Sequence, residues 1–266
     1  MGNFIKYLIR GVPFLGVLML GILGVTPVDA KHSWSGYHWA RTSNPFTLQL
    51  ESDLTTAEWQ SILGAVSADW TADGTALDVL DMTIVDNTAI ALCEPINGKV
   101  RACNSTYGSN GWLGLATIWL TSGTKHIYQG TAKVNDTYFN TSTYNSPVAK
   151  RHVLCQEIGH TFGLGHIKNQ ASCMNDLFGL FSTAYQSPNK HDYDQLASIY
   201  AHLDTPSSPA GTGNGRGNGA ADNEPTDALP PGAGPEHGDI FERDLGNGRT
   251  MITVVTWVQS GAAGQR

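Results

Sequence analysis

Charged residues are scarce in this chain, and basic residues are never clustered. Only 15% of the 266 residues are Asp, Glu, Lys or Arg, a low share for a cytosolic protein, and the formal net charge is −7. Because neutralising phosphate groups takes clustered cations, the composition excludes nucleic acids and anionic membrane surfaces as partners.

The chain has one long apolar run, and this run is too short to span a bilayer comfortably. It covers Gly11–Val25, whereas a spanning helix needs about 20 residues. The run follows basic residues and precedes small residues ending at Ala30, which is the pattern of a signal peptide over residues 1–30. We therefore predict a secreted protein that begins at Lys31 and has no stable membrane association. An uncleaved N-terminal anchor is the alternative.

Cysteine is also rare, and no two cysteines have the spacing of a CxxC metal motif. Four cysteines, an even number in an exported chain, indicate disulfides rather than zinc ligands. Of the three possible connectivities we predict the sequence-local one, Cys93–Cys103 and Cys155–Cys173. Each bridge would stabilise the fold by about 3 kcal/mol.

Apolar spacing predicts an α+β chain in the order strand, helix, strand, loop, strand, strand, helix, helix. The predicted strands are Phe46–Leu50, Leu77–Val85, Leu113–Leu120 and Ile127–Tyr138; the helices run from Thr55 or Thr56 to Trp70, from Val148 to Phe162 and from His191 to His202; and residues 93–112 are expected to be a loop. After Asp204, Pro and Gly dominate, so a linker is predicted over 205–248. Residues 249–266 form a tail with a predicted strand at Arg249–Val258, which docks on the main sheet or pairs elsewhere.

The segment Gln156–His166 carries the residues suited to chemistry. Gln156 and His160 are one helical turn apart, so their side chains face the same way. Glu157 lies about 100° around the helix axis from Gln156. From there its side chain can reach a metal-bound water rather than the metal itself. Gly163 permits a positive φ, so the chain can leave the helix sharply and return His166 from another direction, as tetrahedral coordination requires.

With these residues the segment resembles the HExxHxxGxxH zinc signature of the metzincin metallopeptidases. Glu157, His160, Gly163 and His166 match it at the right spacing, and Met174 looks like the methionine of the family's Met-turn. The order of elements over residues 37–204 resembles a matrixin catalytic domain. The resemblance implies a zincin-like fold over 31–204, in which a twisted mixed β-sheet packs on helices that include an active-site helix.

The chain departs from the signature at its first position, where Gln156 replaces a histidine. Its Oε1 lies as many bonds from Cβ as a histidine Nε2, but a neutral amide oxygen is a poorer zinc donor. In order of preference, Gln156 ligates zinc with His160 and His166, or a water takes its place, or the site is inactive. Latency through a propeptide cysteine is not expected, because no cysteine precedes Cys93.

The resemblance implies a monomeric zinc-dependent endopeptidase acting on a protein or peptide substrate. Glu157 would be the general base toward a zinc-bound water. The strand holding Gly114, Leu115 and Ala116 would form the edge of the cleft, where a substrate adds as an extended strand, and residues 176–181 would wall a pocket. Structural Ca²⁺ is a further cofactor that the resemblance allows. The alternative is a catalytically inactive metzincin-fold binding or adhesion protein that has lost its metal.

The remaining histidines have no ligand spacing and are interpreted as surface or structural residues. They are His32, His38, His126, His191, His202 and His237.

Overall fold

The computed structural model describes residues 32–71, 78–86, 93–176, 181–205, 207–209 and 229–259. The predicted signal peptide over 1–30 and the predicted mature start, Lys31, lie outside these ranges. Within them, no helix is both long enough and apolar enough to cross a membrane.

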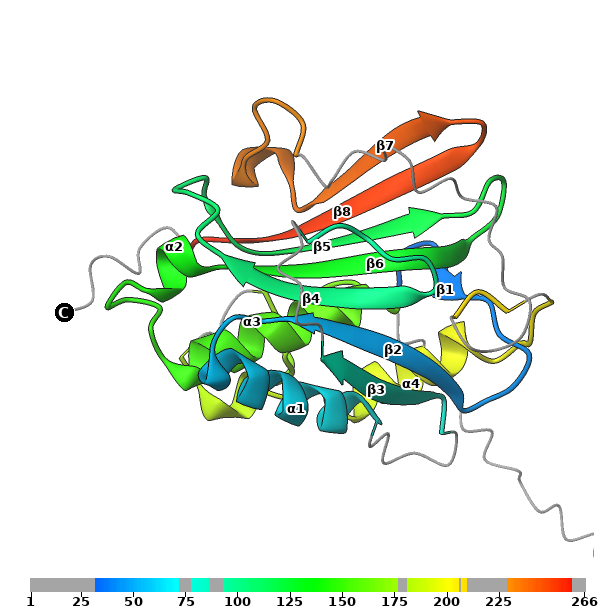
Figure 1. The fold of residues 1–266 in the computed structure, drawn as a ribbon, viewed down its shortest axis with the longest axis horizontal. Helices are drawn as coiled ribbons and strands as arrows, with labels where there is room; N and C mark the ends of the chain where they lie inside the picture. Colours follow the sequence, from blue (N-terminus) through cyan, green and yellow to red (C-terminus); the bar gives the residue numbers. More distant parts are fainter. Residues whose placement is uncertain are drawn as a thin grey trace, which may run out of the picture.

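A mixed sheet forms the main layer, and the helices α1, α3 and α4 lie together on one side of it (Figure 1). In spatial order the strands are β3 (Leu80–Asp86), β2 (Phe46–Asp53), β4 (Lys99–Ser105), β6 (His126–Asn135), β5 (Trp112–Leu120), β8 (Arg249–Trp257) and β7 (Ile240–Gly246), and the short β1 (His38–Trp39) pairs with β6. The pairs from β3 to β6 are parallel, and those from β6 through β5 and β8 to β7 are antiparallel. The predicted mixed sheet packed on helices is confirmed.

The helices form where capping residues precede apolar spacing. Helix α1 (Ala57–Thr71) buries Trp59, Leu63, Val66 and Trp70, a spacing of three to four residues that defines one face. Helix α4 (Lys190–Ile199) begins with a capping box between Asn189 and Asp192. The short α2 (Asp136–Phe139) follows β6 directly.

Helix α3 (Pro147–His160) is the central helix, and most of its side chains are buried. Its N-cap, Ser146, accepts a hydrogen bond from the backbone of Ala149 at 3.1 Å, and Pro147 occupies the first turn, where its missing N–H costs nothing. The start of α3 is therefore fixed by local sequence, and this sets where its last turn falls.

Replacing Ser146 by alanine is expected to lower the free energy of unfolding by about 1 kcal/mol, because losing the cap leaves an amide of α3 without a partner. Urea unfolding would measure the loss. Ser182→Ala, at the exposed cap of the 3-10 turn Thr183–Tyr185, serves as the control with a smaller effect. An equal loss in both variants would contradict the assigned role of Ser146.

Two predicted irregular segments contain strands. The predicted loop over 93–112 includes β4, which lies between β2 and β6 and is paired with both. The loop was predicted because the segment is rich in Gly, Asn and Ser. Arg101 on β4 is buried and pairs with Asp53 on β2 at 3.2 Å. Buried charges are tolerated where they are paired.

The predicted linker over 205–248 includes β7, which forms a hairpin with β8. The turn residue Asn247 has a φ of 54° and Gly248 has a φ of 74°. Asn-Gly is the preferred pair for a two-residue hairpin turn, so the signal was present in the sequence and was missed. The strand predicted at Arg249–Val258 exists as β8, and it docks on the main sheet beside β5.

Candidate active site

The last turn of α3 brings Gln156, Glu157 and His160 into the interior, each with no exposed surface. The chain then turns at Gly163, whose φ is +92° and where a Cβ would collide with the backbone oxygen of Tyr37. This turn returns His166 to the helix end, where its Nε2 lies 3.0 Å from Nε2 of His160. The structure therefore brings together the two histidines that the spacing predicted.

Both imidazoles are oriented by acceptors at their other nitrogen. Nδ1 of His160 lies 2.8 Å from the carbonyl oxygen of Leu164, and Nδ1 of His166 lies 2.5 Å from Oδ2 of Asp239. Each Nδ1 therefore donates, and each Nε2 directs a lone pair toward the other. Asp176 adds a second carboxylate, 3.6 Å from the same nitrogen of His166.

A metal ion fits this pair of nitrogens better than a proton does. Burial, and then the neighbouring His166, lower the pKa of His160 well below its usual value, so protonation of His160 is disfavoured. Two zinc-ligating nitrogens at bond lengths of about 2.0–2.1 Å lie about 3.3–3.4 Å apart in a tetrahedron, close to the 3.0 Å seen here. The donor set is thus suited to zinc.

Thr256 on β8 contacts both remaining residues of the motif. Its Oγ1 lies 2.7 Å from Oε1 of Gln156 and 2.6 Å from Oε1 of Glu157. One hydroxyl carries one hydrogen, so it cannot donate to both. Rotating the Gln156 amide by 180° makes Nε2, which otherwise has no partner, donate to Thr256 and leaves Oε1 free to act as a ligand.

The carboxyl of Glu157 favours its neutral form in this setting. Burial raises its pKa to about 8, against the hydrogen bonds from Thr256 and from the backbone of Ala116. No cationic side chain is among the causes of this shift. A divalent cation beside it would favour the charged form instead.

This pKa predicts a pH dependence for the metal-free chain. Glu157 keeps its proton in the folded state up to about pH 8 but loses it near 4.5 when unfolded. The folded state therefore binds more protons between these values, and stability falls as the pH rises through that window. Comparing urea unfolding of the wild type and Glu157→Gln from pH 4 to 9 isolates this contribution, because the other groups titrate in both. Parallel curves would contradict it.

Met174 lies directly beneath the helix end. It is fully buried, and a Cβ on Gly159 would collide with its sulfur. Its backbone amide donates to Oγ of Ser172 at 2.9 Å, and Ser172 in turn bonds Asp192 of α4 at 2.5 Å. The turn holding Met174 is thus fixed to α4.

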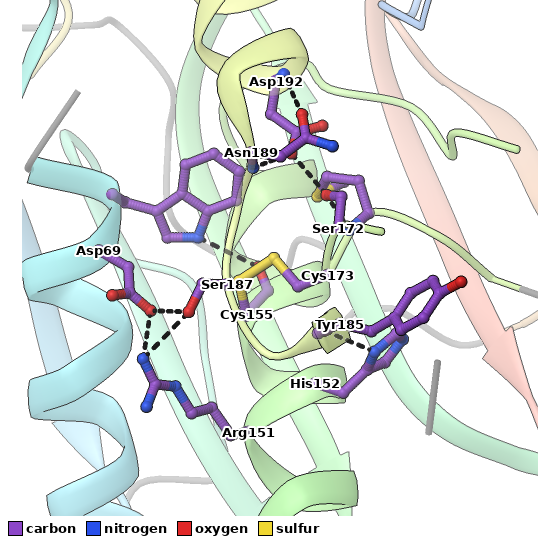
Figure 2. The surroundings of a disulfide bond; sticks show 12 residues. Asp69, Arg151, His152, Cys155, Ser172, Cys173, Tyr185, Ser187, Asn189 and Asp192 are labelled. Carbon is purple, nitrogen blue, oxygen red and sulfur yellow. Dashed lines mark hydrogen bonds and ion pairs between the residues drawn. A yellow bond between two sulfur atoms is a disulfide. The ribbon is translucent and has the colours of Figure 1, made fainter. Parts of the chain in front are cut away.

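A disulfide fixes the same turn to α3. The predicted pairs Cys93–Cys103 and Cys155–Cys173 are both confirmed, and Figure 2 shows the second joining the helix to the residue before Met174. Arg151, one turn earlier on α3, donates to Asp69 of α1 at 2.6 Å (Figure 2). These bonds hold the helix and the turn in one position.

The predicted cleft edge is not an edge. Gly114, Leu115 and Ala116 lie in β5, which is paired with β6 on one side and with β8 on the other. Gly114 faces Thr256 in the β5–β8 register, and a Cβ on Gly114 would collide with the carboxylate of Glu157. The prediction was wrong because β8 buries a run of apolar residues against the sheet and takes the pairing position.

Thr256 and Asp239 are the site residues that the sequence did not reveal. They lie 99 residues from Glu157 and 73 residues from His166 respectively, and no ligand spacing connects them to the motif. The Asn247-Gly248 turn could have predicted the hairpin but not its docking place. Of the expected pocket wall over 176–181, residues 177–180 lie outside the described part of the chain.

Comparisons with known proteins find only remote similarity. No family model and no curated protein sequence matches the chain. Among solved structures, it is similar to high choriolytic enzyme 1, a hatching-enzyme zinc-protease from Oryzias latipes (medaka fish), with a TM-score of 0.35 and 10% identity over 63% of this chain and 96% of that one. It is also similar to metalloproteinase-II from Bacteroides fragilis, with a TM-score of 0.36 and 13% identity over 67% and 60% of the two chains. Because both scores lie below 0.5, neither match supports a conclusion about function.

Proposed function

We propose that this chain is a secreted zinc-dependent endopeptidase with a zincin-like fold. The observation that carries the proposal is the pair of oriented Nε2 atoms, 3.0 Å apart, at the end of the helix that also buries Glu157. His160, His166 and Gln156 would hold the ion, with Gln156 binding through its freed Oε1. Two disulfides and the N-terminal apolar run support export.

Each residue has a separate chemical task. Bound zinc supplies Lewis acidity toward a water and a peptide carbonyl. Glu157 takes a proton from the attacking water and passes it to the leaving amine. Leu164 and Asp239 keep the two imidazoles in the tautomer that leaves Nε2 available. Met174 and the Cys155–Cys173 bridge hold this helix end in place.

The proposal requires the hairpin β7–β8 to move before a substrate can bind. Strand β8 fills the pairing position along β5 that an extended peptide would use, and Thr256 holds the carboxylate that would act as base. Asp239, next to the hairpin, also contacts His166. Under this proposal, the arrangement with β8 paired to β5 would be a closed form of the enzyme.

The same two contacts favour a second candidate function, a binding protein on a peptidase fold. In that case β8 is a permanent part of the sheet, and Gln156 and Glu157 serve only to bind Thr256.

Weakening the hairpin contacts separates the two functions. The wild type and the variant Thr256→Val, which keeps the Asp239 contact to His166, would be assayed for cleavage of an unfolded protein, with a chelator and after zinc is restored. A peptidase should lose activity with the chelator, regain it with zinc and cleave several-fold faster in Thr256→Val. Asp244→Asn, at an exposed position on β7, is the control. Zinc-loaded, folded protein without cleavage in any variant would overturn the peptidase and leave the binding protein.

A further inference from the structure

Three histidines with no motif spacing meet one carboxylate where β1 pairs with the start of β6. His38 on β1 and His126 at the start of β6 are paired residues of neighbouring strands, and His202 and Asp204 follow α4 (Figure 1). The sequence predicted these histidines to be surface or structural residues, yet His38 is buried and all three surround Asp204.

The ring nitrogens of the three histidines lie around the carboxylate of Asp204. Nε2 of His126 and Nε2 of His202 each lie 3.4 Å from Oδ1 of Asp204, and Nε2 of His38 lies 3.4 Å from Oδ2. Nε2 of His38 and Nε2 of His202 are 3.2 Å apart. The ligand atoms of His38, His126 and Asp204 all lie within 4.8 Å of one another. His202 adjoins this group at 3.2 Å from His38 and 3.4 Å from Asp204, close to the ligand–ligand distance of about 3.3–3.4 Å in a tetrahedral zinc site.

Hydrogen bonds already orient the ligand atoms of this cluster. Nδ1 of His38 lies 2.8 Å from the carbonyl oxygen of Gly36, which makes Nδ1 the donor and leaves the lone pair of Nε2 directed into the cluster. Arg41 donates to Oδ2 of Asp204 at 2.8 Å, so Oδ1 is free to act as a single-oxygen ligand. The rings of His38 and His202 meet at 84°, so their nitrogens approach from different directions.

We propose that His38, His126, His202 and Asp204 form a second metal site that takes a divalent transition-metal ion, zinc in particular. Three imidazoles and one carboxylate are donors that zinc accepts. The protein would supply all four ligands of the ion, so the site would have no open coordination position and would be structural rather than catalytic. His202 is 54% exposed at its side chain, which gives the ion a route in.

The ion would fasten the segment after α4 to the sheet. His202 and Asp204 lie about 80 residues from His126 and about 160 from His38 in sequence, so one ion closes two long loops. Without an ion, Arg41 and Asp204 still form an ion pair and the imidazoles remain hydrogen-bonding groups. This metal-free network is the rival account.

Metal counting on the full chain distinguishes the two accounts. After zinc loading and dialysis, the wild type should retain two equivalents, measured by mass spectrometry of the metal. His126→Ala combined with His202→Ala should retain one. Both positions are partly exposed, and circular dichroism would verify folding. His237→Ala, at an exposed histidine outside the cluster, should retain two.

A variant lacking the active-site pair, His160→Ala with His166→Ala, makes this result independent of the proposed peptidase. It should retain one equivalent, its melting temperature should rise with added zinc, and cobalt in place of zinc should give the absorption of a tetrahedral site. Loss of all metal from this variant, or two equivalents retained in the His126, His202 variant, would overturn the second site.

Discussion

Replacing Glu157 by glutamine is expected to slow peptide-bond cleavage by about 10²–10⁴-fold, because an amide cannot accept the proton of the attacking water. Zinc binding should be unchanged, since Glu157 contacts Thr256 rather than either imidazole. The variant should also fold. The fully buried carboxyl of Glu157 has a pKa of about 8 and is already neutral near pH 7 in the metal-free chain, so a neutral amide of similar shape replaces it.

The measurement is kcat/KM on one peptide substrate together with zinc content. Glu242→Gln, at an exposed position on β7, is the matched control and should cleave like the wild type. If Glu157→Gln retained full activity at full zinc content, Glu157 would have no part in the chemistry.

Replacing Gln156 by histidine is expected to tighten zinc binding by roughly 100-fold or more. A third imidazole replaces a neutral amide oxygen as the donor, and loss of an outer-shell partner alone costs about 10–100-fold in metal affinity. The change also removes one partner of Thr256, so it should loosen the contact between β8 and the end of α3.

Competition with a chromophoric chelator would give the zinc dissociation constants of the wild type and of Gln156→His. Gln60→His, on the exposed face of α1, controls for the addition of a histidine anywhere on the chain. Unchanged affinity in Gln156→His would mean that residue 156 does not reach the metal and that Gln156 serves only to hold Thr256.

The features that could be predicted from the sequence lay within short stretches of it. The helix from Ser146, the return of His166 through Gly163 and the two disulfides all depend on residues fewer than twenty positions apart. Spacing along one helix determines which side chains share a face, so the pairing of His160 with His166 followed from local geometry.

The features that could not be predicted depend on distant segments. The Gly, Asn and Ser residues around β4 predicted a loop, because the strand depends on partners on β2 that local composition does not show. The second neighbour of β5 is a strand near the other end of the described chain. His38, His126 and Asp204 meet only after the sheet and α4 have packed. The spacing of residues along the chain does not predict contacts between segments this far apart.

The place of β8 in the chain has a consequence for how the protein is made. Thr117 on β5 and Thr253 on β8 face each other although 136 residues separate them. Forming this pairing therefore costs a large loop-closure entropy, and we expect it to form late in folding. A nascent chain that has emerged as far as Asp204 already carries α3 and both histidines but still presents β5 as an open edge. In a concentrated refolding mixture, that edge can take β8 from a second chain, and hairpin-exchanged dimers are the expected misassembled product.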